Sequence, residues 1–204
     1  MDAMSQAPVR RSPGRPRDPE VDTRILAAAR EVYSARGWSG FTLDEVARSA
    51  QVSKGALYLR WADKATLILD AVRTQVPSLG GIDTGALRSD LVEFAHQWGR
   101  FIRSKDGTML ARLGLDQRFY PEIDAAFKAA PFPSYISDTI TIVRRGIKQG
   151  ELPKDTSASL VGDLVAGAVT NHMRQMPEAK LNDSHLERFI ADVIDIVLAG
   201  VNNR

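Results

Sequence analysis

The amino-acid sequence predicts an all-α fold. Apolar residues recur every three or four positions in successive segments, helix-capping residues and glycine or proline separate those segments, and no stretch alternates like a strand. With 204 residues and 44% hydrophobic residues, the chain has room for a small helical domain followed by a medium one. We expect an arm over 1–17, a first domain over 18–75 and a second over 76–204.

The first helix begins near Pro19. Asp18, Pro19 and Glu20 have the order of a cap, a first-turn proline and an early acid. Gly37 can adopt the left-handed conformation that closes a helix. Between these ends runs an apolar stripe of Ile25, Ala28, Ala29, Val32 and Tyr33.

Two short helices joined by a tight turn are expected over residues 41–64. Thr42 and Glu45 form a capping box that starts the first of them, and Ser53 is a good N-cap for the second. Asp63 caps a fourth, connecting helix that runs toward residue 77. A helix pair of this kind is typical of the helix-turn-helix unit that reads DNA.

The outer face of the second helix of the pair suits a DNA groove. Lysine and arginine bind guanine or phosphate, a tyrosine hydroxyl reaches phosphate, and small residues let the backbone approach base edges. That face carries Lys54, Gly55, Ala56, Tyr58, Leu59 and Arg60. Cationic helix pairs also occur in helical proteins that never touch DNA, so the pair alone leaves the function open.

The helices on either side of the pair favour DNA binding. With them, the chain resembles the TetR family of bacterial transcription regulators from about Val21 to about Ala71. The resemblance is carried by ILAAAREVYSARGWSGFTLDEVA, VSKGALYLRW and ADKATLI, which are correctly spaced. Trp61 departs from the usual phenylalanine, and Gln51 stands where glycine is common in the turn. If the φ of Gln51 is positive, the strain is on the order of 1 kcal/mol.

The resemblance implies which residues contact DNA. Ser53 to Ala56 should approach bases or phosphate, and Arg60 is placed for a base contact at a position where family members vary. Phosphate contacts are expected from Thr42, Tyr58 and Lys64. The full set is Thr42, Ser53, Lys54, Gly55, Ala56, Tyr58, Arg60 and Lys64. The alternatives are that Tyr58 serves only packing and that Lys64 is a solvated surface charge.

Residues 1–17 form a second DNA-directed feature. Their proline, glycine, serine and arginine cannot bury a core, which predicts a disordered basic arm. Four arginines against Asp2 give four minus one, an excess of three positive charges, from Arg10, Arg11, Arg15 and Arg17. The GRP core at 14–16 resembles an AT-hook, whose arginine lies in a narrow minor groove. The alternative is a basic terminus that adds only counterion release.

Further helices are expected beyond residue 77, where the resemblance implies an all-helical regulatory domain. A loop over 78–83 precedes them, and Asp106 with Gly107 should separate the first helix from the second. The expected segments are 84–105, 108–117, 121–129, 134–149, 157–176 and 184–199.

The resemblance also implies a ligand pocket among the middle helices. The predicted wall residues are Trp98, Phe101, Met109, Leu113, Phe119, Phe127 and His172, and the predicted polar contacts are His96 and Arg112. The alternative is ordinary core packing. Ligand binding would shift the connecting helix and change the separation of two recognition helices, with a coupling of about 1 to 3 kcal/mol.

Two late helices are expected to form a homodimer. One short recognition helix contacts few base pairs, whereas a twofold dimer reads two half-sites about 34 Å apart. Small residues four apart and a strongly apolar last helix supply the predicted contacts, Gly162, Ala166, Ile190, Ile194 and Val197. Burial of these residues inside the monomer is the alternative.

Composition limits the other function classes. The chain has no cysteine, which removes disulfides and thiolate metal sites, and its three histidines, His96, His172 and His185, lack metal-ligand spacing. No catalytic motif, signal peptide or membrane span is evident, so we expect a cytoplasmic protein without metal or cofactor. The expected partners are double-stranded DNA, a second copy and an unidentified small-molecule effector. The rival functions are a helical DNA-architectural protein without a ligand switch and, less favoured, a helical enzyme.

Overall fold

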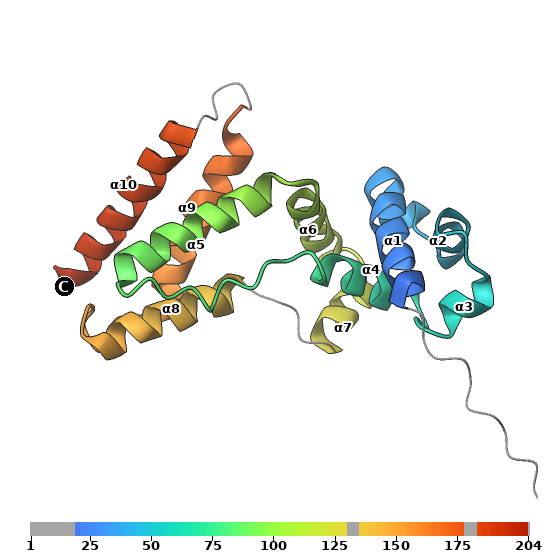
Figure 1. The fold of residues 1–204 in the computed structure, drawn as a ribbon, viewed down its shortest axis with the longest axis horizontal. Helices are drawn as coiled ribbons and strands as arrows, with labels where there is room; N and C mark the ends of the chain where they lie inside the picture. The colour runs from blue at the N-terminus through green and yellow to red at the C-terminus, as the bar shows by residue number, and fades with distance from the viewer. Residues whose placement is uncertain (1–18, 130–134, 178–182, 204) are drawn as a thin grey trace, which may run out of the picture.

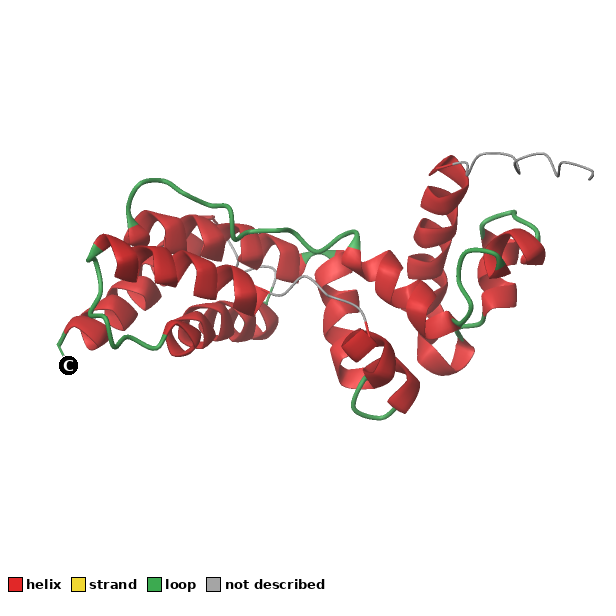
Figure 2. Cartoon of the chain, turned by 90° about the horizontal axis from the view of Figure 1, so that it is seen from below, coloured by secondary structure: helices red, strands yellow, loops and turns green. Residues whose placement is uncertain are grey.

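The computed structural model describes residues 19–129, 135–177 and 183–203, and this part of the chain forms helices and no strands (Figure 2). The predicted all-α fold is confirmed. In chain order the described helices are α1 (Pro19–Gly40), α2 (Leu43–Ser49), α3 (Lys54–Tyr58), α4 (Lys64–Arg73), α5 (Leu87–Arg103), α6 (Lys105–Asp116), α7 (Pro121–Ala129), α8 (Tyr135–Gln149), α9 (Ala158–Gln175) and α10 (Asp183–Asn202).

The helices are arranged along an elongated molecule (Figure 1). Helices α1 to α4 lie at one end, α5, α8, α9 and α10 pack together at the other, and α6 and α7 lie between the two groups. This arrangement places α3 at the end of the molecule farthest from α10.

Local capping explains where the short helices of the N-terminal part begin. The hydroxyl of Thr42 accepts from the Glu45 amide at 3.2 Å, that of Ser53 from the Ala56 amide at 3.1 Å, and the carboxylate of Asp63 from an amide of α4 at 2.8 Å. Each contact satisfies an amide that lacks a partner within its helix. The three predicted N-caps are therefore confirmed.

Gly37 interrupts α1 near its end. Its φ is 64°, in the left-handed region, as expected for the residue that closes the main part of this helix. A Cβ at this position would lie 2.1 Å from a guanidinium nitrogen of Arg112, which belongs to α6. The left-handed φ therefore favours glycine here, and a Cβ would also require the end of the Arg112 side chain to move.

The N-terminal hydrophobic core does not end with α4. Buried residues of α1 to α4, such as Ile25 and Leu57, form one cluster with Met109 and Leu113 of α6 and Ile123 of α7. The boundary expected at residue 75 consequently separates two segments of sequence that share one core.

A second hydrophobic core joins α5, α8, α9 and α10. Asp90 of α5 is buried within it and accepts from Arg145 of α8 at 2.7 Å. Burial alone would raise the pKa of Asp90, but hydrogen bonds from Thr84 and the guanidinium of Arg145 outweigh it and lower that pKa. A charged pair thus holds the start of α5 against α8.

The expected break at Asp106 and Gly107 is wrong, because both residues belong to α6. The chain turns at Ser104 instead, whose hydroxyl accepts from the Gly107 amide at 3.1 Å and caps α6. A Cβ on Gly107 would lie 2.1 Å from the carbonyl oxygen of Phe101. The glycine therefore permits a close approach of α5 and α6 rather than ending a helix.

None of the helices described by the structure combines the length and the apolar character that a bilayer span requires.

Candidate nucleic-acid interface and pocket

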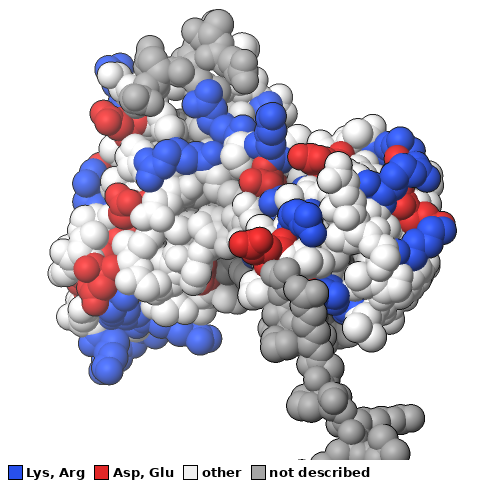
Figure 3. Space-filling model, turned by 45° about the vertical axis from the view of Figure 1, so that its right-hand side comes forward, with Lys and Arg blue, Asp and Glu red and all other residues white. Residues whose placement is uncertain are grey.

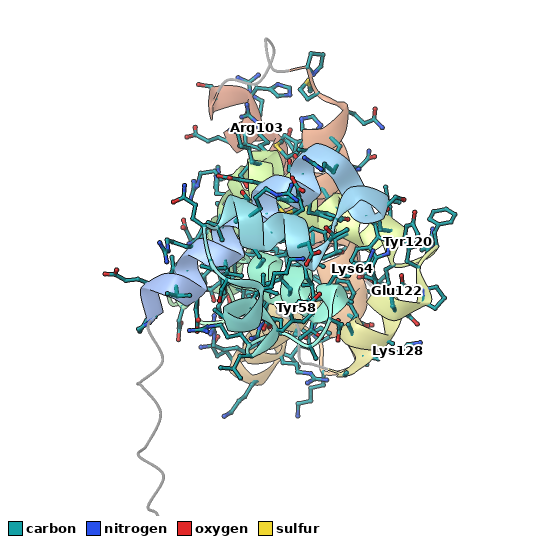
Figure 4. All side chains as sticks on the ribbon, turned by 90° about the vertical axis from the view of Figure 1, so that its right-hand side faces the viewer. Tyr58, Lys64, Arg103, Tyr120, Glu122 and Lys128 are labelled. Carbon is teal, nitrogen blue, oxygen red and sulfur yellow. The ribbon has the colours of Figure 1, made fainter. Side chains whose placement is uncertain are left out.

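Helix α3 presents an open face at the end of the molecule. Leu57 is fully buried, whereas the side chains of Tyr58 and Leu59 are 51% and 81% exposed. Gly55 lies on the same side, and a Cβ there would meet nothing within 4 Å. Figure 4 shows Tyr58 at this end of the molecule, toward the viewer. A groove of DNA could therefore approach the backbone of α3 closely.

Three of the residues predicted to bind phosphate lie around one hollow. Thr42, Tyr58 and Lys64 line a shallow depression of about 350 Å³ beside the N-terminus of α2, together with Phe41, Leu43 and Asp44. The free amides at the starts of α2 and α4 favour an anion nearby. The fold thus brings together residues from three different helix boundaries.

Lys64 is held at the edge of this hollow by Trp38. Its Nζ donates to the Trp38 carbonyl at 3.2 Å and lies 3.9 Å from the centre of the Trp38 ring. The Trp38 indole donates to Glu122 of α7 at 3.0 Å, and Figure 4 shows Lys64 and Glu122 on the same side of the molecule. A backbone hydrogen bond, the Trp38 indole and the charge of Lys64 together lower the pKa of Glu122.

The cation that begins α3, Lys54, and the one that follows its end, Arg60, differ in placement. Lys54 is exposed and forms an ion pair with Asp44 at 2.6 Å. Arg60 instead folds back onto α1, where it pairs with Asp22, and its side chain is only 12% exposed. Its guanidinium also donates to the Ala56 carbonyl at 2.9 Å. Arg60 therefore does not share the open face with Lys54, and a base contact would require it to leave Asp22.

Two neighbours of the predicted DNA contacts were absent from the predicted set. Leu59, the C-cap residue of α3, is 81% exposed, and Asp44 is the carboxylate that pairs with Lys54. The outward position of Leu59 was visible in the helical pattern. The pairing of Asp44 with Lys54 depends on how α2 and α3 cross, which the sequence alone does not specify.

The surface charge near this end is mixed. On the face drawn in Figure 3, Lys and Arg side chains are interspersed with Asp and Glu. The predicted contacts of the arm, Arg10, Arg11, Arg15 and Arg17, lie outside the residues that the structure describes.

A pocket of about 760 Å³ lies among α5, α6, α7, α8 and α9. Of the nine residues predicted to contact a ligand, Trp98 and Phe127 line it. The described lining residues are Trp98, Ile102, Gly107, Leu110, Ala111, Gly114, Leu115, Gln117, Arg118, Phe127, Tyr135, Thr170 and Arg174.

Three other predicted ligand residues lie on α6 but face the N-terminal part. Met109 and Leu113 are buried in the N-terminal core, so assigning them to the pocket chose the wrong face of α6. Arg112 donates to the Ser34 carbonyl at 3.1 Å, at the end of the regular part of α1. The pocket is lined by the other face of the helix, through Leu110 and Gly114.

The remaining predicted ligand residues also lie away from the lining. Phe119 is exposed beyond α6, and His96 and Phe101 are half-buried on α5. His172 stacks on Phe189 with 3.7 Å between ring centres, and its Nε2 lies 3.2 Å from that of His185. Burial and the neighbouring His185 lower the pKa of His172.

Helix α6 connects this pocket to the N-terminal part. Besides the contacts of Leu113 and Arg112, the buried Tyr33 hydroxyl of α1 donates to Asp116 at 2.6 Å. Burial, together with the neighbouring Asp116, raises the pKa of Tyr33. One short helix thus forms both a pocket wall and a polar and apolar attachment to α1.

The residues predicted at a dimer interface are buried within the monomer. Ala166, Ile190, Ile194 and Val197 belong to the C-terminal core, and a Cβ on Gly162 would lie 2.4 Å from the Thr139 hydroxyl of α8. Their small size and apolar character serve packing inside one chain, although Val197 also borders a groove on the surface of α9 and α10. The same helices expose other apolar residues, Leu160, Leu164 and Ile196, around a groove of about 320 Å³.

Among the described residues, no three His, Asp or Glu side chains gather in a way that could hold a metal ion.

The N-terminal and the C-terminal part of the chain each match a family of known proteins. Residues 25–71 match the family described as "Bacterial regulatory proteins, tetR family", and residues 82–193 match "Tetracyclin repressor-like, C-terminal domain". The second match alone spans more than half of the chain.

Relatives with similar sequences cover nearly the whole chain. An uncharacterized HTH-type transcriptional regulator, YdeS of Bacillus subtilis, is 29% identical over 91% of this chain and 94% of its own length. A DNA-binding transcriptional repressor TetR of Mycobacteroides abscessus is 28% identical over 85% of this chain and 92% of its own.

A solved structure shows the same fold. GusR of Salmonella enterica superposes with a TM-score of 0.67 at 16% sequence identity, covering 91% of this chain and 96% of that one. The family matches extend over both the α3 end and the pocket region. The chain therefore belongs to the tetR family of bacterial regulatory proteins and is a DNA-binding transcriptional regulator.

Proposed function

We propose that this regulator is a repressor that binds an inverted-repeat operator as a homodimer and leaves it when a small molecule enters the pocket. The observation that carries the DNA-binding site is the hollow lined by Thr42, Tyr58 and Lys64 beside the open face of α3. Phosphates bound there would fix the register of α3, while Lys54 and Gly55 approach the bases. Repression is supported by the related repressor of Mycobacteroides abscessus.

The dimer is supported by the exposed face of α9 and α10. Leu164 and Ile196 are 47% and 72% exposed, and with Leu160 they border one groove. A second copy would remove these side chains from water. It would also add a second α3, which a five-residue helix needs because it contacts few base pairs by itself.

The effector response is supported by the double role of α6. A molecule in the pocket contacts Leu110 and Gly114, while Leu113, Arg112 and Asp116 on the same helix contact α1. A ligand that prefers a different position of α6 therefore changes the placement of α1 and α3. Couplings of this type are typically about 1 to 3 kcal/mol, or roughly 5- to 150-fold in DNA affinity.

The basic arm, the two parts of the chain and the cellular location each have a place in this function. The arginines of 1–17 would add minor-groove or phosphate contacts beside the operator half-sites. The DNA-binding part would comprise 18–75 and the regulatory part 76–204, with α6 and α7 contributing to both cores. Because bacterial operators lie in the cytoplasm, the protein would act there.

Selection of bound sequences from a random DNA pool with the full-length protein tests this function. We expect an inverted repeat whose half-site centres are about 34 Å apart, with affinity that falls steeply as salt rises. Binding without sequence enrichment would favour the architectural alternative and would contradict the repressor proposal.

A further inference from the structure

The pocket combines an apolar body with a cationic edge. Trp98, Leu110, Leu115, Phe127 and Tyr135 supply apolar and aromatic surface from four helices. A volume of about 760 Å³ is within the range of roughly 300 to 1,000 Å³ that suits small organic ligands. The apolar walls therefore favour a molecule with a sizeable hydrocarbon or aromatic part.

The charged residues in the described part of the lining are both positive. Arg118 follows the end of α6 and Arg174 lies in the last turn of α9, and none of the described lining residues is acidic. Neither guanidinium forms a hydrogen bond or an ion pair with a residue that the structure describes. A positive charge is favourable near the C-terminus of a helix, which accounts for each arginine by itself. It does not account for two helices that both place an arginine at the same pocket.

The polar groups described next to these arginines carry no negative charge that pairs with them. Gln117 of the lining donates to Asp124 at 2.9 Å, but Asp124 is paired with Lys128 at 2.6 Å. Thr170 accepts from the Trp98 indole at 2.9 Å, which leaves its own hydroxyl hydrogen free to donate to a ligand. The edge of the pocket thus offers donors and positive charge.

Gly114 leaves space open at the wall of the pocket that α6 forms. A glycine inside a helix destabilises it by roughly 0.5 to 1 kcal/mol relative to alanine. No close contact explains Gly114, because a Cβ there would meet nothing within 4 Å. Its missing side chain enlarges the pocket near the C-terminal end of α6.

We infer that the effector is an amphipathic organic anion, with an apolar body among α5 to α8 and a carboxylate-like group bound by Arg118 and Arg174. Guanidinium groups bind planar oxyanions through two parallel hydrogen bonds, and such charge-assisted bonds are stronger than neutral ones. The apolar walls fix the body, and the arginines select for charge. This inference rests on the proposed effector response of the same pocket.

Two dyes with the same ring system test it. 8-Anilinonaphthalene-1-sulfonate is an anion, and N-phenyl-1-naphthylamine is its neutral counterpart without the sulfonate. We expect the purified full-length protein to bind both, measured by fluorescence titration. The double change Arg118→Gln with Arg174→Gln should weaken binding of the anion at least about tenfold and change binding of the neutral dye less than about twofold.

Two further variants locate the dyes and control for net charge. Gly114→Phe fills open space and should abolish binding of both dyes while the melting temperature stays near wild type. Arg103→Gln with Arg188→Gln removes two exposed arginines outside the pocket and should leave both affinities unchanged. Equal losses for both dyes in the Arg118 and Arg174 variant, no loss for the anion, or dye binding that survives Gly114→Phe would overturn the inference.

The dye measurements involve no DNA, which separates this inference from the proposed function. If the random pool yields no operator while the arginines still select the anionic dye, the repressor proposal fails and the ligand class stands. If an operator is found but the arginines do not distinguish the dyes, only the ligand class fails.

Discussion

Gln51 lies in the turn between α2 and α3 with a φ of 55°, and among the described residues it is the only one other than glycine with a positive φ. The left-handed region crowds the Cβ of an L-residue against the backbone, which is why glycine is preferred there. The crossing of α2 over α3, stabilised by the buried Leu57, holds the turn in this conformation.

Gln51→Gly should raise the free energy of unfolding by up to about 1 kcal/mol, since it removes the strain at a positive φ. Urea denaturation followed by circular dichroism would measure the gain. Gln51→Ala is the control, because alanine keeps the Cβ and should unfold at nearly the wild-type midpoint. A lower midpoint for the glycine variant would contradict this account of the turn.

At the scale of elements, α3 shows how a very short helix can be both stable and exposed. An isolated five-residue helix does not form in water, because nucleation is unfavourable. Here Ser53 caps its start and Leu57 anchors it in the core, so the opposite face, with Lys54 and Tyr58, is left to solvent. The helical repeat therefore places the buried anchor on one side of α3 and the residues proposed to face DNA on the other.

Lys54→Ala and Tyr58→Ala should each weaken binding to the selected operator by roughly 3- to 10-fold without changing the melting temperature, because both side chains are exposed. Fluorescence anisotropy at several salt concentrations would measure the affinity. A lysine that contacts phosphate should also reduce the salt slope by about one when it is removed.

Lys148→Ala is the matched control for these variants, because Lys148 is an exposed lysine on α8, at the other end of the molecule. It should bind the operator like wild type. Unchanged affinity in both the Lys54 and the Tyr58 variant would exclude the open face of α3 as the DNA-reading surface.

At the scale of the whole molecule, two hydrophobic cores meet at α6. One face of this helix lines the pocket, and the other is buried with α1 and α4. Since packed cores shift between discrete arrangements rather than deform gradually, we expect a change at the pocket to reach α1 through Leu113 and the Tyr33–Asp116 hydrogen bond. The exposed groove of α9 and α10 lies at the opposite end from α3, so a dimer formed there leaves both α3 helices free.

Leu164→Glu combined with Ile196→Glu should shift the protein from dimer to monomer, because it places charges on apolar surface that a second copy would bury. Size-exclusion chromatography with light scattering would measure the mass, and operator affinity should fall with it. Phe119→Glu changes an apolar residue that is even more exposed and lies away from the groove, and it should leave the dimer intact. If the double variant is still a dimer, the groove of α9 and α10 is not the dimer interface.

The sequence by itself determined the features that depend on near neighbours in the chain. The N-caps at Thr42, Ser53 and Asp63 and the left-handed Gly37 follow from hydrogen bonds and backbone sterics within a few residues. Helical periodicity likewise separated the buried Leu57 from the exposed face of α3. These local preferences predicted the first helix, the helix pair of α2 and α3 and the start of α4.

Only the tertiary structure decided which face of a helix meets which neighbour. Leu113 and Ile194 carried an apolar signal that suits a pocket, an interface or a core equally, and packing assigned both to cores. Arg60 and Arg112 likewise found their partners in α1, far away in sequence. Such burial and pairing join helices that are far apart in the sequence. A local sequence pattern does not indicate which of these helices will pack together.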